Sequence, residues 1–295
     1  MEKKIYYIVD VFAEEKYAGN QLAVFLNGSL YSDVEMQQIA KEMNFSETTF
    51  IMSGSVVDDS IPVRIFTPAE ELPFAGHPTL GTAYIVQQEI IGKMIPLLNL
   101  DLKIGKIPVT FEYLNDRPDI ITMQQMEPTF GKVFKKEELC DILNIDPTDI
   151  DDRFPIEEAS TGMPDIMVPL KTLNAVKRCS IDTKKYYDLI KNLDSKAIMV
   201  FAPETYHAGN QLNVRMFADY FGVPEDPATG SANGALTGYL VKNRYFDTDK
   251  ISIRVEQGYE IGRPSLLYLN GSETDGKIDI MVGGKVVKIA KGEWN

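Results

Sequence analysis

One stretch of this chain is present twice, and the repeat limits the folds that the chain can adopt. The first copy is a Val-Arg-Ile-Phe segment at 63–66 with a Pro/Gly loop at 73–76. The second is a Val-Arg-Met-Phe segment at 214–217 with a loop at 227–230. The segments are 151 positions apart and the loops 154, so a three-residue insertion separates the copies. Each copy has the pattern of a strand, a loop and an apolar helix, which predicts two related halves.

The secondary structure expected from the sequence is rich in strands. Ser32 and Glu35 have the spacing of a capping box and predict a helix from that point. The repeat predicts helices at 78–88 and 231–241, and further helices are expected at 135–143 and 183–191. The predicted strands, many of which pair as hairpins, are 5–12, 21–26, 47–52, 61–66, 106–113, 120–126, 165–170, 197–201, 211–217, 251–256, 265–269, 277–282 and 285–290.

These elements predict an α+β fold of two pseudo-symmetric domains, each a mostly antiparallel curled sheet around a central helix. The Asn-Asp-Arg-Pro turn at 115–118 is expected to mark the change of half. The N-terminal half is then residues 1–117, completed by the last strand at 283–295, and the C-terminal half is residues 118–282. If the halves face each other, the two loop-to-helix junctions meet, and we expect the active site there.

The charge and the cysteine content exclude several classes of protein. A formal net charge of -13 over 295 residues repels phosphate backbones, so nucleic acid is not an expected partner. Cys140 and Cys179 are the only cysteines and form no CxxC or Cys/His cluster, so neither a metal site nor a disulfide framework is expected. No apolar run reaches the ~18 residues of a membrane span, and the N-terminus lacks the apolar core of a signal peptide. We therefore expect a cytoplasmic protein that does not enter membranes.

The two junctions have the features of a site for a small anion. A helix N-terminus presents unpaired backbone N–H groups and a partial positive charge, and a preceding glycine lets a ligand approach the backbone. Two such termini, at Gly76 and Gly230, would together hold a carboxylate and stabilise negative charge that develops beside it. The alternative is that both loops are only tight turns, with Ser231 acting as a helix cap.

The polar residues near the two junctions differ. His77 follows the first glycine, whereas Asp226 and Ser231 flank the second. Glu47 begins an apolar strand, where glutamate is a poor residue unless it is paired or functional. If Glu47 is partly buried, its pKa would rise towards the range of a general acid/base. The structural alternatives are an edge charge for Glu47, a structural histidine, and turn residues at Asp226 and at Asn20.

A Ser–His–Asp hydrolase can also be assembled from Ser231, His77 and Asp226. However, Ser231 lacks the GxSxG elbow of such enzymes, and a serine at a helix start is normally a cap. The loop at 226–233 lacks the Lys-Ser/Thr pair of a P-loop, and the chain contains no GxGxxG fingerprint. Proton-transfer chemistry is therefore favoured over hydrolysis or nucleotide binding.

The motifs of the chain resemble those of the PhzF-like (phenazine biosynthesis-like) proteins, which share the diaminopimelate epimerase fold. The resemblance covers nearly the whole chain and rests on the segments Val-Asp-Val-Phe at 9–12, Gly-Asn-Gln-Leu-Ala-Val at 19–24, Phe-Ser-Glu-Thr at 45–48, Phe-Thr-Pro at 66–68, Glu-Leu-Pro-Phe-Ala-Gly-His-Pro-Thr at 71–79 and Glu-Asp-Pro-Ala-Thr-Gly-Ser-Ala at 225–232. The resemblance implies two pseudo-symmetric domains with the active site in the cleft between them, and a homodimer.

The resemblance also implies isomerase chemistry without a cofactor. In the best-understood member a glutamate moves a proton within a cyclic, unsaturated amino acid, a dihydro-hydroxyanthranilate, and Glu47 matches that glutamate. His77, Asp226 and Ser231 match its supporting residues. The residues that match the substrate-binding positions are Asn20, Gly76, Pro78, Thr79, Gly230, Ser231 and Ala232.

The chain departs from the pattern of related proteins at three positions. The related epimerases and racemases have a cysteine just before each glycine, where this chain has Ala75 and Thr229, so a two-thiol racemase is disfavoured. Gln21 stands where the PhzF-like proteins often have proline. We expect a cofactor-independent isomerase that moves a proton on a small carboxylate or amino-acid-like substrate. The alternative is a non-catalytic small-molecule-binding or interaction protein that retains the fold.

Overall fold

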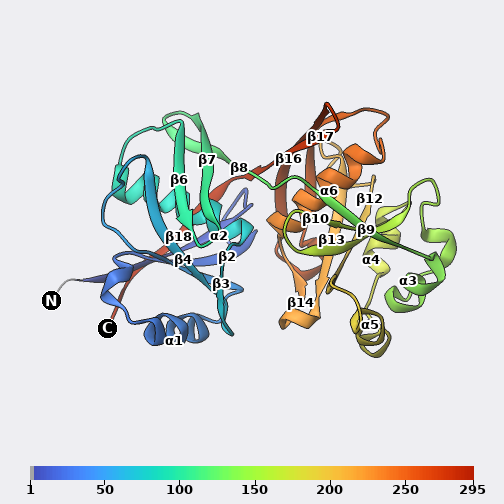
Figure 1. Cartoon of the computed structure of the whole chain (residues 1–295), viewed down its shortest axis with the longest axis horizontal. Helices are drawn as coiled ribbons and strands as arrows, with labels where there is room; N and C mark the ends of the chain where they lie inside the picture. Colours follow the sequence, from blue (N-terminus) through green and yellow to red (C-terminus); the bar gives the residue numbers. More distant parts are fainter. Residues whose placement is uncertain (1–2) are drawn as a thin grey trace. The chain divides into compact units, whose positions relative to one another are not determined.

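The computed structural model describes residues 3–295 (Figure 1). The chain forms two compact units. Unit 1 contains Met1–Gln124 and Gly283–Asn295, and unit 2 contains Gln125–Val282. Both are α+β structures in which strands outnumber helices. None of the helices formed by residues 3–295 has the length and apolar character that crossing a membrane requires.

The strands of unit 1 form a ladder in the order β18–β1–β2–β3–β4–β6–β7–β8, and the short β5 pairs with β4. Neighbours are antiparallel except for the parallel pairs β2–β3 and β4–β6. The strands are β1 (Lys4–Val11), β2 (Asn20–Phe25), β3 (Glu47–Ile51), β4 (Ser60–Phe66), β5 (Glu71–Leu72), β6 (Leu97–Leu102), β7 (Gly105–Leu114), β8 (Arg117–Gln124) and β18 (Val286–Trp294).

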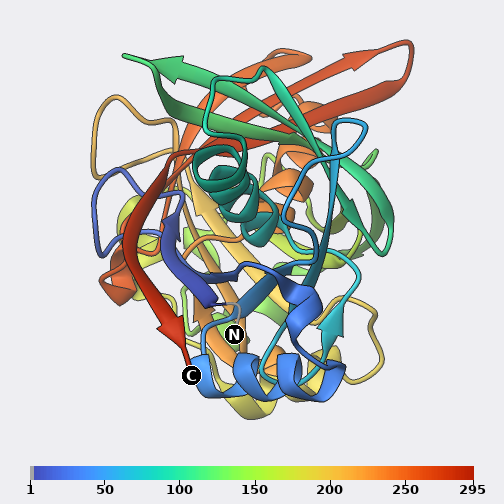
Figure 2. The ribbon, with the colours of Figure 1, turned by 90° about the vertical axis from the view of Figure 1, so that its left-hand side faces the viewer.

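Helix α2 (Gly76–Ile85) is the core of unit 1. It contacts β1, β2, β3, β6, β7, β8 and β18, and the strands surround it in Figure 2. All its residues except Tyr84 are buried, as expected for a helix that is apolar or small on every side. At Gly81 an added Cβ would lie 2.6 Å from the Leu22 side chain, so only glycine lets the sheet approach this closely. A π-helical turn (Val86–Ile91) continues the chain.

Helix α1 (Asp33–Met43) packs against β3 and β4, and its N-terminus confirms the predicted cap, because Ser32 Oγ accepts the N–H of Glu35. Its buried residues are three or four positions apart, as in a helix with one apolar face: Met36, Ile39 and Ala40.

The last strand contributes to an aromatic cluster in unit 1. Trp294 packs edge-on against Tyr6 and Phe25, with ring centroids 5.9 and 5.5 Å apart. Edge-to-face aromatic pairs add to the stabilisation from buried area. The end of the chain therefore supports both the sheet and the core of a unit that begins at the N-terminus.

The strands of unit 2 form a ladder in the order β9–β10–β11–β12–β13–β15–β16, with β14 on β13. The parallel pairs are β11–β12 and β13–β15. The strands are β9 (Thr129–Phe134), β10 (Ile156–Ser160), β11 (Pro164–Pro169), β12 (Ala197–Ala202), β13 (Leu212–Ala218), β14 (Val223–Asp226), β15 (Lys250–Gln257), β16 (Ser265–Thr274) and β17 (Lys277–Gly284).

Helix α6 (Gly230–Lys242) is almost entirely buried and contacts β10, β11 and β16. A second apolar core contains residues of α3 (Lys136–Leu143), α4 (Leu173–Arg178) and α5 (Thr183–Ile190) together with strand residues such as Ile166. The helices predicted at 135–143, 183–191 and 231–241 are confirmed, whereas α4 was not predicted.

The two units use the same succession of pairings. The pairs β1–β2, β2–β3, β3–β4 and β4–β6 are antiparallel, parallel, antiparallel and parallel, and so are β10–β11, β11–β12, β12–β13 and β13–β15. The repeated Val-Arg segments lie in β4 and β13, and the chain continues from them through β5 to α2 and through β14 to α6. The predicted strand–loop–helix repeat is therefore confirmed in each unit.

Candidate functional site

Unit 1 brings Glu47 and His77 together. Glu47 is the first residue of β3, and His77 is the second residue of α2. His77 Nε2 lies 3.3 Å from Glu47 Oε2, and the side chains are only 6% and 16% exposed. A residue at the start of a strand thus reaches the first turn of the central helix.

The environment of His77 keeps its imidazole neutral. Burial lowers the pKa of His77 from 6.5 to about 3, although a hydrogen bond to the backbone of Gln21 acts in the opposite direction. Neutral imidazole has one nitrogen that donates and one that accepts. His77 can therefore exchange a hydrogen bond with the Glu47 carboxyl group without bringing a positive charge beside it.

Asn20 lies at the same end of the parallel pair β2–β3 as Glu47, because each is the first residue of its strand. Its side chain is buried. The preceding Gly19 has φ +65°, and an added Cβ would lie 2.3 Å from the Val11 carbonyl oxygen. Only glycine fits this entry to the strand, so Gly19 fixes where Asn20 begins the pairing.

The N-terminus of α2 has no side-chain cap. The N-cap residue is Ala75, which has no side-chain oxygen, and Pro78 has no N–H. The Thr79 hydroxyl donates to the Ala75 carbonyl oxygen at 2.7 Å. The terminus therefore presents the N–H groups of Gly76 and His77, and its partial positive charge favours an anion.

In unit 2 the predicted residues lie on one loop and the start of α6. Asp226 is the last residue of β14, and the Thr229 hydroxyl donates to Asp226 Oδ2. The helix begins at Gly230 with Thr229 as N-cap, so the interpretation of Ser231 as the cap is wrong. The Ser231 carbonyl oxygen accepts a hydrogen bond from Thr161 at 3.1 Å, and Ala232 is buried in the first turn.

Two buried residues that hold this loop, Gln257 and Asn233, were not predicted from the sequence. Gln257 Nε2 donates to the Asp226 carbonyl oxygen at 2.8 Å and to Thr229 Oγ1 at 3.1 Å. Gln257 Oε1 accepts from the Thr229 N–H at 3.2 Å and from Asn233 Nδ2 at 2.8 Å. The only signal in the sequence is a glutamine at the end of a strand, directly before Gly258. That glycine has φ +79°, and an added Cβ there would lie 2.6 Å from the Pro227 carbonyl oxygen.

Both cysteines lie in an apolar core of unit 2. Burial raises the pKa of Cys140 to about 11 and that of Cys179 to about 12, so both are thiols at neutral pH. Among residues 3–295, no group of three or more His, Cys, Asp and Glu side chains is arranged to hold a metal ion.

Comparison with known proteins identifies the family. The sequence profile of PhzC-PhzF, described as phenazine biosynthesis-like protein, matches residues 9–292. The chain belongs to the PhzC-PhzF family. This PhzC-PhzF protein is 35% identical to the trans-2,3-dihydro-3-hydroxyanthranilate isomerase of Pseudomonas chlororaphis over 97% of its own length and 98% of the relative's. It is an isomerase, as its relatives are named.

Solved structures agree with this assignment. The PhzC-PhzF protein superposes on the crystal structure of a Bacillus anthracis phenazine biosynthesis protein of the PhzF family with a TM-score of 0.90, at 29% identity and full coverage of both chains. A probable proline racemase from Agrobacterium radiobacter shares the fold, with a TM-score of 0.66 at 10% identity over 99% of this chain and 93% of that one.

Proposed function

We propose that this isomerase moves a proton within a small, unsaturated carboxylate-bearing substrate, with Glu47 as general acid/base and without a cofactor. The observation that carries the proposal is the 3.3 Å contact between Glu47 and a neutral His77 at the N-terminus of α2. A carboxyl group in such a partly buried setting is suited to proton transfer near neutral pH.

In the proposed reaction the Glu47 carboxylate takes a proton from one carbon of the substrate. The electrons of the broken C–H bond spread into the unsaturated system, and Glu47 returns the proton to another carbon. While Glu47 carries the proton, the His77 Nε2 lone pair can accept a hydrogen bond from it. His77 therefore stabilises the acid form of Glu47, and neutrality of the imidazole is needed for this role.

Each helix terminus, at Gly76 in unit 1 and at Gly230 in unit 2, is proposed to bind an anionic group such as a carboxylate. Pro78 and Thr79 shape the first turn of one helix, and Ser231 and Ala232 that of the other. Asn20 and Asp226 are proposed to position other polar groups of the substrate. The relatives' name supports a cyclic dihydro-hydroxyanthranilate as the first compound to test.

The proposal is tested by incorporation of deuterium at carbon. Trans-2,3-dihydro-3-hydroxyanthranilate is incubated in D2O with the wild type, with Glu47→Gln and with Glu42→Gln, and mass spectrometry measures the label. Glu42 is exposed on α1 and is the matched control. We expect label with the wild type and Glu42→Gln, and at least about a thousandfold slower labelling with Glu47→Gln. Undiminished labelling by Glu47→Gln would contradict the assignment.

A further inference from the structure

Each repeated segment carries an arginine that binds a glutamate in the short strand before the following loop. In unit 1, Arg64 Nε and Nη2 donate to the two oxygens of Glu71, both at 2.8 Å. In unit 2, Arg215 Nε and Nη2 donate to the two oxygens of Glu225 at 2.9 and 2.7 Å. Parallel paired hydrogen bonds of this kind fix direction as well as distance. The two ion pairs therefore occupy the same place in both copies of the repeat.

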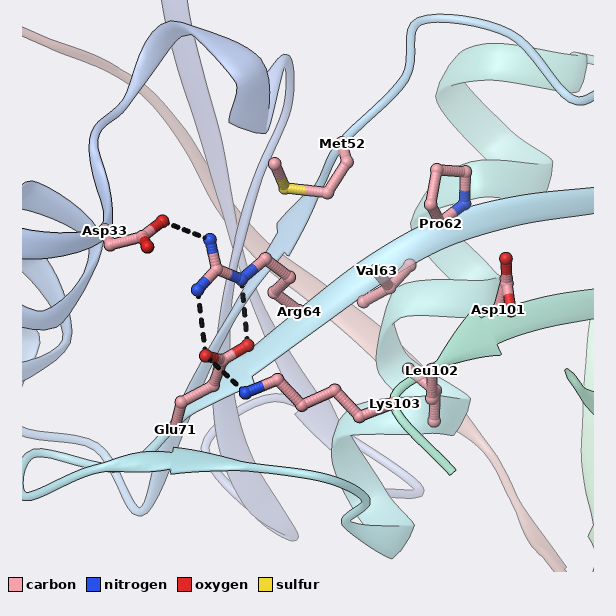
Figure 3. Close-up of a pocket in the computed structure, with 9 residues that line it drawn as sticks. All are labelled: Asp33, Met52, Pro62, Val63, Arg64, Glu71, Asp101, Leu102 and Lys103. Atoms are coloured by element: carbon pink, nitrogen blue, oxygen red, sulfur yellow. Dashed lines mark hydrogen bonds and ion pairs between the residues drawn. The ribbon is translucent and has the colours of Figure 1, made fainter. Parts of the chain in front are cut away.

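The remaining guanidinium nitrogen of each arginine, Nη1, bonds to a helix that connects two parallel strands. The helix is α1, between β2 and β3, in unit 1 and α4, between β11 and β12, in unit 2. Arg64 Nη1 donates to Asp33, the first residue of α1, at 2.5 Å. In Figure 3 Arg64 lies between Asp33 and Glu71, and Lys103 approaches the same Glu71 carboxylate, with a separation of 2.7 Å. Arg64 therefore links Glu71 to helix α1, which packs against β3 and β4.

In unit 2 the corresponding arm of Arg215 meets the end of α4. Its Nη1 donates to the carbonyl oxygens of Val176 at 3.0 Å, Lys177 at 3.3 Å and Cys179 at 2.7 Å. A cation is favoured at a helix C-terminus, where carbonyl groups lack partners. The guanidinium therefore joins three segments: β13, the end of α4 and β14, which leads to α6.

We propose that Arg64 and Arg215 are positioning residues that set the two loops leading to α2 and α6, and this inference rests on the proposed function of those loops. Glu225 directly precedes Asp226, so Arg215 fixes that residue through one peptide link. Glu71 begins the short strand β5, from which the chain runs to Gly76 and His77. Neither arginine is expected to touch the substrate.

The two ion pairs, Arg64–Glu71 and Arg215–Glu225, differ in exposure, and this decides which substitutions test each one. The side chains of Arg215 and Glu225 are 10% and 9% exposed, whereas those of Arg64 and Glu71 are 23% and 15%. Removing one partner of a buried ion pair leaves an uncompensated charge and strongly destabilises a protein. The charge reversals are therefore made in unit 1, and Arg215 is replaced only by lysine, which keeps the charge but cannot form the paired hydrogen bonds.

The experiment compares Arg64→Glu, Glu71→Arg, the double reversal, Arg215→Lys and the wild type. Arg244→Lys, at an exposed Arg–Glu pair with Glu273, is the matched control. Hydrogen–deuterium exchange is measured for peptides covering 68–77 and 225–231, and turnover of trans-2,3-dihydro-3-hydroxyanthranilate by incorporation of deuterium. All measurements are made well below the midpoint of thermal unfolding.

We expect each single reversal to speed exchange in 68–77 and to lower kcat/KM by about ten- to a hundredfold, because small displacements of positioning groups have effects of this size. The double reversal should recover only part of the slow exchange and of the activity, because Asp33 and Lys103 repel the reversed charges. Arg215→Lys should affect 225–231 instead. The positioning role would be contradicted if all variants exchanged at the wild-type rate. It would also be contradicted if the double reversal exchanged as fast and turned over as slowly as the single reversals. If the wild type fails to label the substrate, the proposed function fails for that compound. The exchange rates of the single and double variants still test the positioning role of the arginines.

Discussion

The loops leading to α2 and α6 begin with the same kind of ion pair but end in different ways. In unit 1 the loop ends at His77, whose Nε2 lies 3.3 Å from Glu47 Oε2. In unit 2 the loop is held by neutral amides, since Gln257 and Asn233 bond to its backbone and to Thr229. One topology therefore supports a contact between a carboxyl group and an imidazole in one copy and a network of hydrogen bonds from amides in the other.

Each unit has a carboxyl group of low exposure at a parallel strand pair, but Glu47 is on the second strand of its pair and Asp165 on the first. In the parallel pair β2–β3, Glu47 is in register with Leu22. In the parallel pair β11–β12, Asp165 is in register with Ala197 and is 6% exposed. Burial raises the pKa of Asp165 to about 8, so it is protonated at neutral pH. Glu47 lies beside a histidine, whereas the pKa of Asp165 is set by burial alone.

The largest effect is expected when the network of unit 2 is broken. Gln257→Leu removes four hydrogen bonds and leaves buried partners unsatisfied, which should lower the free energy of unfolding by about 4 kcal/mol. Urea unfolding measures the loss, and Gln38→Leu on the exposed face of α1 is the control. A variant as stable as the wild type would show that the amides do not hold the loop.

A smaller, pH-dependent effect is expected at Asp165. The unfolded state loses this proton above pH 3.8 and the folded state only near 8, so the contribution of Asp165 to stability is present below pH 3.8 and is lost as the pH rises through 8. Asp165→Asn should therefore gain about 3 kcal/mol relative to the wild type between pH 5 and 7. Urea unfolding at both pH values tests this, with exposed Asp188→Asn as control. A pH-independent difference would contradict a protonated Asp165.

The smallest effect is expected at His77 and has the opposite sign. Between pH 6.5 and about 3 the unfolded state binds a proton that the folded state does not, so stability falls as the pH falls. From pH 6.5 to 5 the wild type should lose about 2 kcal/mol that His77→Gln does not lose. Urea unfolding at pH 6.5 and at pH 5 measures it, with exposed His207→Gln as control. Parallel curves for wild type and variant would mean that His77 is protonated in the folded protein.

The sequence predicts the parts of the fold that have local signals. The Ser32 cap, the two repeat helices and most strands follow from spacing and turn residues. Strand β10 was missed because Glu157 and Glu158 conceal its pattern. Glu157 is buried and binds Lys242 and Asn243 at the end of α6, and these partners are far away in the chain. Long-range partners can make a strand of residues that the local pattern assigns elsewhere.

The motifs of the candidate site could be predicted from the sequence, but the residues and contacts that hold them in place could not. Residue types at the loop-to-helix junctions point to Glu47, His77 and Asp226, because glycine, a helix start and nearby acids or histidine suggest anion binding and proton transfer. Gln257 has no such local signal, since it acts on a loop about 30 positions away in the sequence. The 3.3 Å contact between Glu47 and His77 likewise depends on how β3 lies against α2.

The pairing of β18 with β1 has a consequence for synthesis of the protein. Strand β1 lies between β2 and β18, so during synthesis β1 lacks one neighbour until residues 286–294 have followed. The pairings from β9 to β16 need no residue beyond Thr274. The later half of the gene product can therefore reach its native pairing first, while the unit bearing Glu47 keeps an open strand edge that chaperones can recognise.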